Sequence, residues 1–173
     1  IVCDRFRAGK KWKNLEGVLI TETVAPEEVI PWLNSEGKNL HAIIHMGAIS
    51  ATTETDVDKI IHNNFKLSSD LWHASIDLNL PFIYASSAAT YGDGSRGFDD
   101  DESSKALSLL QPLNPYGWSK LIFDRKIIAL KEKSFPTPPQ WVGLKFFNVF
   151  GPNEHHKGDM RSVLNKVFPQ VYN

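Results

Sequence analysis

The chain has 173 residues, a formal net charge of -1 and 42% hydrophobic residues. This length allows one core of ordinary size, so a single water-soluble domain is the default expectation. Basic residues are interspersed with a nearly equal number of acids, which argues against binding to nucleic acid or to a membrane surface. The sequence also lacks an apolar stretch of the roughly 18 residues that a bilayer requires. Its single cysteine, Cys3, excludes an internal disulfide and favours a reducing compartment such as the cytoplasm.

The N-terminal residues predict a short apolar strand that ends in an acid, Asp4. A basic turn follows at 5–11 and a helix is expected at 26–33, because proline is favoured at a helix start. In a dinucleotide-binding fold, an acid at the end of the second strand binds the adenosine ribose, roughly 20 residues after a glycine-rich phosphate loop. No such loop precedes Asp4, and a helical pattern from Arg161 is still in progress at residue 173. We therefore expect a chain that is truncated at both ends.

The middle of the chain alternates between strand and helix patterns. A β-branched run at 42–48 predicts a buried parallel strand, and apolar residues at helical spacing over 55–78 predict a long amphipathic helix. A second strand is expected at 81–87, a polar loop at 92–115, a helix at 116–133 and a third buried strand at 141–149. This alternation predicts an α/β fold, a doubly wound parallel sheet of the Rossmann-like type with right-handed crossovers.

Three side chains form a candidate proton-transfer site. Ser87 ends the strand at 81–87, and Tyr116 and Lys120 lie four residues apart on one face at the start of the following helix. The lysine ammonium favours the phenolate by direct attraction, so the tyrosine can act as a base towards a hydroxyl that the serine holds. A Tyr-Lys pair at this spacing also occurs on many helix surfaces. Its place downstream of a strand ending in Ser-Ser-Ala-Ala-Thr-Tyr-Gly is what favours catalysis.

These motifs resemble the extended, nucleotide-sugar-modifying branch of the short-chain dehydrogenase/reductase superfamily. The resemblance narrows at 146–160, where Phe-Asn-Val-Phe-Gly-Pro is followed by His-Lys-Gly-Asp-Met, a run similar to that of the ADP-L-glycero-D-manno-heptose 6-epimerase family. Segments 85–92 and 112–117 are similar to the same family, so the resemblance runs from Asp4 to about Val163. The run that contains Lys157 is its most specific part.

The resemblance implies an isomerase that inverts C6 of an ADP-linked heptose, a precursor of bacterial lipopolysaccharide, by transient oxidation and re-reduction with a nicotinamide cofactor. Tyr116 and Lys157 would handle protons in two orientations of the sugar, and a homo-oligomer is expected. The implied catalytic residues are Ser87, Tyr116, Lys120 and Lys157. The implied substrate contacts are Ser87, Asn148, Lys157, Asp159 and Lys166, of which Asp159 and Lys166 differ from the residue types typical of the family.

The expected cofactor is NADP, with NAD also accepted. Asp4 favours NAD, because a carboxylate binds the ribose hydroxyls and repels a 2′-phosphate, whereas the basic turn at 5–11 can bind such a phosphate. The expected cofactor contacts are Asp4, Arg5, Lys11, Met46, Gly47, Ala48, Asn63, Tyr116, Lys120 and Val149. Residues 1–150 are assigned to the cofactor-binding domain and residues 151–173 to the beginning of the substrate-binding region.

Several alternatives stay open. A nucleotide-sugar 4-epimerase would share the Ser-Tyr-Lys residues, and a non-catalytic regulator would share the cofactor-binding fold. A 4,6-dehydratase would need an acidic pair where this chain has Ala88 and Ala89. No metal is expected, because His41 and His45 lie too far apart along one strand to share an ion.

Overall fold

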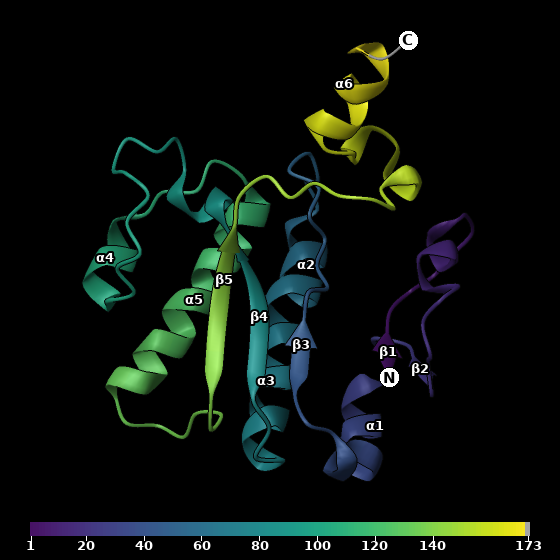
Figure 1. Ribbon diagram of the computed structural model, residues 1–173. Coiled ribbons are helices and arrows are strands. Elements are labelled where there is room, and N and C mark those ends of the chain that lie inside the picture. The colour runs from purple at the N-terminus through teal and green to yellow at the C-terminus, as the bar shows by residue number, and fades with distance from the viewer. Residues whose placement is uncertain (172–173) are drawn as a thin grey trace. The chain divides into compact units, whose positions relative to one another are not determined.

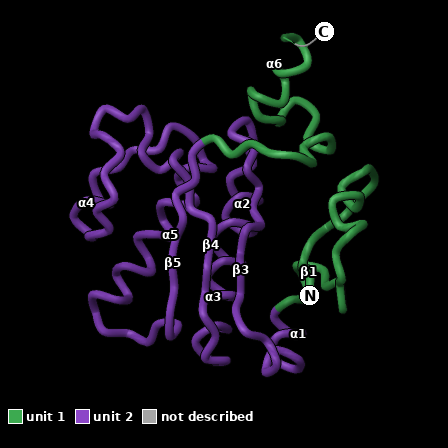
Figure 2. Tube along the Cα trace, viewed as in Figure 1, with its two compact units in different colours: residues 1–29, 148–173 green, residues 30–147 purple. Residues whose placement is uncertain are grey.

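The computed structural model describes residues 1–171 (Figure 1). The chain divides into two compact units, coloured separately in Figure 2. The smaller unit consists of residues 1–29 together with the segment from residue 148, and the larger unit consists of residues 30–147. Among residues 1–171, no helix combines the length and the apolar character needed to cross a bilayer.

A parallel three-stranded sheet forms the centre of the larger unit. Its strands are β3 (Ile43–His45), β4 (Phe82–Ser87) and β5 (Trp141–Phe146), in the order β3-β4-β5. The register pairs Ile43 with Phe82, and Phe82 with Trp141. Because all three strands run in the same direction, their carboxyl ends lie at one edge of the sheet. The sequence predicts a parallel sheet, and the structure adds that β4 is the middle one of these three strands.

The predicted helix at 55–78 is present as one continuous helical segment of three parts. It comprises α2 (Val57–Ile60), a π-helical segment (Ile61–Lys66) and α3 (Leu67–Asp77). Asp56 caps its start by accepting a hydrogen bond from the backbone N–H of Lys59 at 3.0 Å. The predicted helix at 116–133 is α5 (Pro115–Glu132), where Asn114 is the N-cap and Pro115 occupies the first turn.

The helices α3 and α5 cover one face of this sheet, the far face in Figure 1. Aromatic rings make up much of the core between them. Trp72 of α3 meets Phe82 edge to face at 5.8 Å and Phe123 of α5 at 6.4 Å, and all three side chains are almost fully buried. Each such pair adds about 0.5–1.5 kcal/mol beyond the burial of its apolar area. The core therefore ties the middle strand to both helices.

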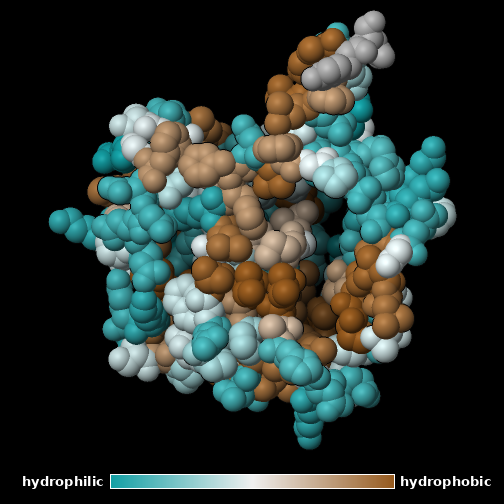
Figure 3. Space-filling model, viewed as in Figure 1, coloured by the Kyte–Doolittle hydropathy of each residue, from teal (hydrophilic) through white to brown (hydrophobic). Residues whose placement is uncertain are grey.

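The other face of the sheet is open. Ile44 of β3 is 64% exposed, and Val142, Leu144 and Phe146 of β5 are between 37% and 42% exposed. Figure 3 shows apolar side chains gathered over this face. The sequence predicts that β3 and β5 are buried, and this is wrong for the residues of these strands that point to the open face. An apolar run marks a strand that has apolar residues on both faces, but it does not specify what covers each face.

The segment at 92–115 is not only a polar loop, as the sequence suggested, because it contains α4 (Ser104–Leu109). Ser103 caps this helix by accepting from the N–H of Ala106 at 3.1 Å. At its other end, the guanidinium of Arg125 in α5 donates to the carbonyl of Leu107 at 3.0 and 2.8 Å. Leu107 is only 2% exposed. This single buried leucine and the two caps hold a helix too short to show a clear apolar period.

The smaller unit contains β1 (Val2–Cys3) and β2 (Thr23–Val24), which pair in parallel. A short 3₁₀ segment, Lys11–Leu15, lies in the connection between them. The helix expected at 26–33 begins later, as α1 (Val29–Glu36), because residues 25–28 form a turn closed by a bond from Glu28 N–H to the Ala25 carbonyl at 2.9 Å. The C-terminal helix expected from Arg161 is α6 (Val163–Val171).

Candidate active site

Ser87 is the last residue of β4 and the N-cap of the 3₁₀ turn Ala88–Tyr91. Its hydroxyl oxygen accepts a hydrogen bond from the backbone N–H of Ala89 at 3.1 Å. Its backbone carbonyl accepts from the hydroxyl of Thr90 at 2.8 Å. These bonds fix the serine while leaving the hydrogen of its own hydroxyl available for a ligand.

Gly117 brings the start of α5 against this turn. A β-carbon added at Gly117 would lie 2.6 Å from the carbonyl oxygen of Ala89, closer than real β-carbons approach other atoms. Glycine is therefore required for the two backbones to pack at this distance. Tyr116 precedes Gly117 in the same turn, so this contact brings the segment that carries Tyr116 to the segment that follows Ser87.

Lys120 lies one turn further along α5 and is only 3% exposed. Burial lowers the pKa of Lys120 to about 8, and the negative charge of Asp124 opposes this change. The buried His45, on β3, has a pKa lowered to about 4, first by burial and then by the charge of Lys120. Lys120 therefore carries its charge below about pH 8, and His45 is neutral at pH 7.

Asn64 connects the π-helical segment to α5. Its side chain is fully buried, and its amide nitrogen donates to the carbonyl of Ile49 at 3.0 Å and to the hydroxyl of Ser119 at 3.1 Å. Its amide oxygen accepts from the N–H of Ile49 at 2.8 Å. Ser119 in turn donates to the carbonyl of Tyr116 at 2.7 Å. The amide therefore holds the loop after β3 and the first turn of α5 in one network.

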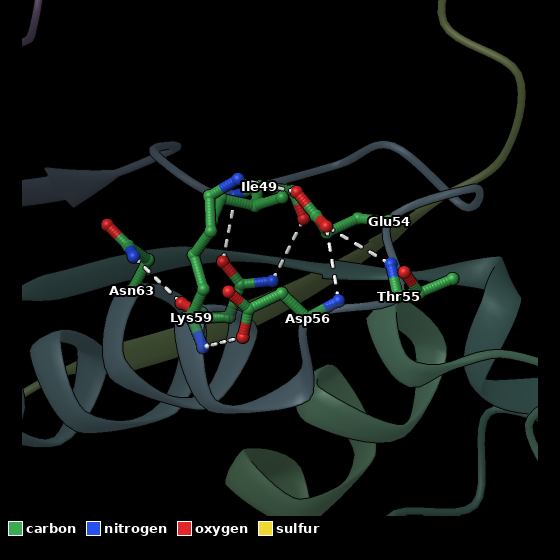
Figure 4. A network of polar contacts seen from close by, with 7 residues as sticks. Ile49, Glu54, Thr55, Asp56, Lys59 and Asn63 are labelled. Atoms are coloured by element: carbon green, nitrogen blue, oxygen red, sulfur yellow. Dashed lines mark hydrogen bonds and ion pairs between the residues drawn. The ribbon is translucent and has the colours of Figure 1, made fainter.

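Asn63, which the sequence predicts as a cofactor contact, makes a different bond from that of its neighbour Asn64. Its amide donates to the carbonyl of Lys59 at 2.8 Å, one turn back along the same helix (Figure 4). Figure 4 also shows Glu54, which accepts from the N–H groups of Thr55 and Asp56 at 3.1 Å and binds the ammonium of Lys59. The asparagine whose side chain bonds a residue of α5 is Asn64. The sequence alone does not show which of the two adjacent asparagines points towards α5.

The expected cofactor contacts Met46, Gly47 and Ala48 follow β3 and are exposed. A β-carbon on Gly47 would meet only the His45 ring, at 3.9 Å, which is ordinary contact. The packing of the protein itself therefore does not require glycine at this position. The open backbone lies at the carboxyl end of β3, where parallel sheets bind their ligands.

The expected cofactor contacts of the smaller unit are paired with one another and with a nearby acid. Asp4 accepts from the ammonium of Lys11 at 2.6 Å and from the backbone N–H of Arg5 at 2.7 Å. The side chain of Arg5 donates to Glu27, with a distance of 2.7 Å from Nε. The acid that favours NAD and a base that favours NADP thus form one partly exposed ion pair.

Lys157 lies in the 3₁₀ segment His155–Met160 of the smaller unit, with its side chain exposed. The sequence analysis missed the residue that organises this segment, which is Glu154. Its carboxylate is buried and accepts from the N–H groups of Gly151 at 3.1 Å and Ser162 at 2.5 Å. In the sequence, only its position three residues before Lys157 could have pointed to Glu154.

The remaining expected contacts also belong to the smaller unit. Asn148, Val149, Asp159 and Lys166 are all exposed or partly exposed. The ammonium of Lys166 donates to the backbone carbonyl of Asp159 at 2.5 Å. Within residues 1–171, no three His, Cys, Asp or Glu side chains gather in a way that could hold a metal ion.

Comparison with known proteins gives consistent results. The model of the NAD dependent epimerase/dehydratase family matches residues 2–173. An ADP-L-glycero-D-manno-heptose-6-epimerase from Fusobacterium nucleatum subsp. nucleatum is 44% identical over 172 residues, which cover 98% of this chain and 51% of that protein. The chain thus spans about half the length of the curated relatives it matches.

Solved structures agree with these sequence matches. The crystal structure of the Helicobacter pylori ADP-L-glycero-D-manno-heptose-6-epimerase is similar with a TM-score of 0.71 and 26% identity, over 90% of this chain and 47% of that one. UDP-glucuronic acid 4-epimerase from Bacillus cereus, solved in complex with NAD, has a TM-score of 0.62 at 26% identity, over 82% of this chain and 44% of that one. The predicted Rossmann-like fold and the predicted family resemblance are confirmed.

Proposed function

This chain belongs to the NAD dependent epimerase/dehydratase family, and from that premise we propose that the protein inverts C6 of an ADP-linked heptose, converting the D-glycero form to the L-glycero form. The observation that carries the proposal is the close packing of α5 on the turn after Ser87, which brings the Tyr116 segment to that serine and buries Lys120 one turn away. The 44% identity to a relative named for this reaction supports the choice of substrate.

The chemistry of the larger unit suits the removal of a proton from a hydroxyl. Ser87 accepts from Ala89 N–H, so its own hydrogen is free to bond the sugar oxygen. Tyr116 takes the hydroxyl proton as a phenolate, and the charged Lys120 stabilises that phenolate across one helical turn. The open backbone at Gly47 leaves room for a nicotinamide cofactor, which when bound would supply the hydride acceptor and then the donor. Asp4, in the smaller unit, is proposed as a contact for the cofactor ribose.

Inversion requires the oxygen at C6 to be protonated again after the carbonyl has turned over. We assign this second role to Lys157, on the segment that Glu154 organises. Asn148, Asp159 and Lys166 are proposed as contacts for the rest of the sugar nucleotide, and Asn64 replaces Asn63 as the residue that orients the catalytic helix. An exposed amine matches this role, because it can exchange its proton with solvent between turnovers.

The cofactor is proposed to be NADP, with NAD also accepted. Lys11 and Arg5 can contact a 2′-phosphate only by exchanging their present partners, Asp4 and Glu27. An exposed ion pair of this kind contributes about 0–1 kcal/mol, which a phosphate with two charges can readily offset. The remaining cofactor contacts, the homo-oligomer and the cytoplasmic location stay predictions.

The test is to incubate the intact protein with ADP-D-glycero-D-manno-heptose and to follow the configuration at C6 by proton NMR. Turnover to the L-glycero product is expected, and Tyr116→Phe should reduce it by about 10²–10⁴-fold while cofactor binding persists. Trp118→Phe, a change two residues away at a side chain that is 40% exposed, is the matched control and should keep the wild-type rate. A protein that binds the cofactor and leaves C6 unchanged would be a regulator, and conversion of a UDP-hexose instead would identify a 4-epimerase.

A further inference from the structure

Asp124 is a buried carboxylate that the proposed reaction does not use. It lies on α5, four residues after Lys120, and is only 4% exposed. Residues four apart on a helix share one face, so the carboxylate projects from the same side of α5 as the lysine. Asp and Glu are rarely buried to this degree unless a partner compensates their charge.

Two hydroxyl groups of the middle strand hold this carboxylate. Tyr84 donates to one carboxylate oxygen at 2.7 Å and Ser86 donates to the other at 2.6 Å. Tyr84 has space to do so because its partner on β5 is Gly143, where a β-carbon would overlap the tyrosine ring. Both oxygens thus accept a hydrogen bond, an arrangement that satisfies the ionised form of the acid.

Charged groups of several elements face Asp124. Burial, the largest effect, raises the pKa of Asp124 above its ordinary value, and the bonds from Ser86 and Tyr84 and the charges of Lys145 and Lys120 oppose this rise. Asp124 and Lys145 also line a small cavity of about 60 Å³ together with three acids of the 92–103 loop, Asp100, Asp101 and Glu102. On the other side, Lys120 is near the neutral His45 of β3.

From this geometry we infer that Asp124 is a positioning residue for Lys120: fixed by Tyr84 and Ser86 one helical turn beyond the lysine, its carboxylate keeps the buried ammonium group charged. The inference deepens the proposed function, and it relies on that function only for the role of Tyr116. An uncharged Lys120 would no longer stabilise a phenolate. The carboxylate would therefore support the base from two turns away without contacting the substrate.

A purely structural role for Asp124, joining β4 to α5, is the competing explanation. Both explanations predict a loss of stability when Asp124 is replaced. They differ in the ionisation of Lys120, which changes only if the charge of the carboxylate matters. The decisive measurement is therefore the titration of that one amine, which needs no substrate and is independent of the identity of the sugar.

The experiment uses the intact protein labelled with ¹³C at the ε-carbon of lysine and follows the Lys120 signal by NMR as the pH is raised, with Lys120→Arg as the assignment variant. Asp124→Asn keeps the shape of the side chain and one acceptor oxygen. Its matched control is Asp77→Asn, the same change at an exposed residue at the end of α3. The Lys120 midpoint is expected to move to lower pH in Asp124→Asn, to stay unchanged in Asp77→Asn and to recover towards the wild-type value in Asp124→Glu.

An unchanged midpoint in a folded Asp124→Asn protein would overturn the inference. If that variant does not fold, the ¹³C carboxyl signal of Asp124 in the wild-type protein decides: it must show an ionised acid at neutral pH, and a protonated acid there would equally overturn the inference. In the epimerase assay, the alkaline decline of kcat should move to lower pH in Asp124→Asn while KM is retained. Absence of any epimerase activity in the wild type would reject the proposed function and leave the titration result standing.

Discussion

The side-chain amide of Asn64 donates to Ser119 Oγ at 3.1 Å. Through the further bond from Ser119 to the Tyr116 carbonyl, a residue of the π-helical segment holds the first turn of α5. A π-helical segment inside an α-helix often marks a functional site, because the wider turn redirects side chains. Here it directs one of two adjacent asparagines inwards and leaves the other on its own helix.

Replacing Asn64 by alanine is expected to lower the free energy of unfolding by about 2–4 kcal/mol, because it removes a fully buried amide and leaves two partly buried backbone groups of Ile49 and the buried Ser119 hydroxyl without this partner. Asn63→Ala, in which the lost amide bonds a carbonyl of its own helix, should cost less than about 1 kcal/mol. Urea unfolding of both variants measures the difference. Equal losses would show that the buried network does not stabilise the site.

Gly117→Ala reverses the usual sign of a helical substitution. Alanine in place of glycine inside a helix normally stabilises by about 0.5–1 kcal/mol. At Gly117 the new methyl group would meet the Ala89 carbonyl at 2.6 Å, so we expect destabilisation by about 1–3 kcal/mol and a loss of epimerase activity. Gly17→Ala, where no atom lies within 4 Å of the added carbon, is the control. A thermal unfolding series that finds Gly117→Ala as stable as the wild type would contradict the close packing.

His45 is expected to make stability fall in acid. Its pKa is lowered from 6.5 to about 4 in the folded protein, so the unfolded chain binds more protons between these values. Above pH 6.5 the histidine is neutral in both states and does not oppose folding. As the pH falls from 6.5 to 4, the free energy of unfolding decreases by about 3 kcal/mol. His45→Gln should flatten this dependence in urea unfolding at several pH values, whereas His62→Gln, at an exposed residue, should not. A wild-type profile that is flat over this window would show that the imidazole is not buried in its neutral form.

Lys120 should weaken the fold at neutral pH. Its pKa is about 8 in the folded protein, below the ordinary value of 10.5. Below about pH 8 the lysine is charged in both the folded and the unfolded state, so folding then bears the full free-energy cost of burying the charge. Lys120→Met is expected to stabilise the cofactor-free protein by about 1–3 kcal/mol at pH 7 and to abolish catalysis. The gain should shrink between pH 8 and 10.5, where the folded wild type loses its proton first. A methionine variant that unfolds more easily than the wild type at pH 7 would show that the charge is fully compensated.

Lys157→Ala is expected to reduce epimerase turnover by about 10²–10⁴-fold without changing the unfolding transition, because the side chain is exposed and buries little. Lys133→Ala, at the exposed end of α5, is the matched control. The measurement is kcat for the heptose alongside thermal unfolding. Wild-type turnover in Lys157→Ala would exclude two proton donors on opposite sides of the sugar.

The order of strands and helices in the larger unit was predictable because its signals are local. The apolar period over 55–78 and the proline and asparagine before α5 specify helices directly. The strand end at Ser87 and the helix that carries Tyr116 and Lys120 were predictable for the same reason. The motif around Lys157 indicated the family that the comparisons confirm.

The features that the sequence did not reveal depend on contacts between distant segments. Asn64 and Asn63 are chemically identical and both lie in the π-helical segment, and only the bond from Asn64 to Ser119 of α5 distinguishes them. Asp124 is four residues from Lys120, but its burial requires the hydroxyls of Tyr84 and Ser86 from another element. Helix α4 depends on Arg125, 18 residues after Leu107. No periodicity encodes such pairings.

The close contact between Tyr84 and Gly143 means that substitutions at these two positions depend on each other. A larger residue at 143 is compatible with this sheet only if the ring at 84 has already become smaller, and a smaller residue at 84 gives up the phenol that holds Asp124. The two positions therefore have to change together, with the acid as a third participant. In an evolving lineage, this part of the sheet would be expected to vary as a unit or not at all.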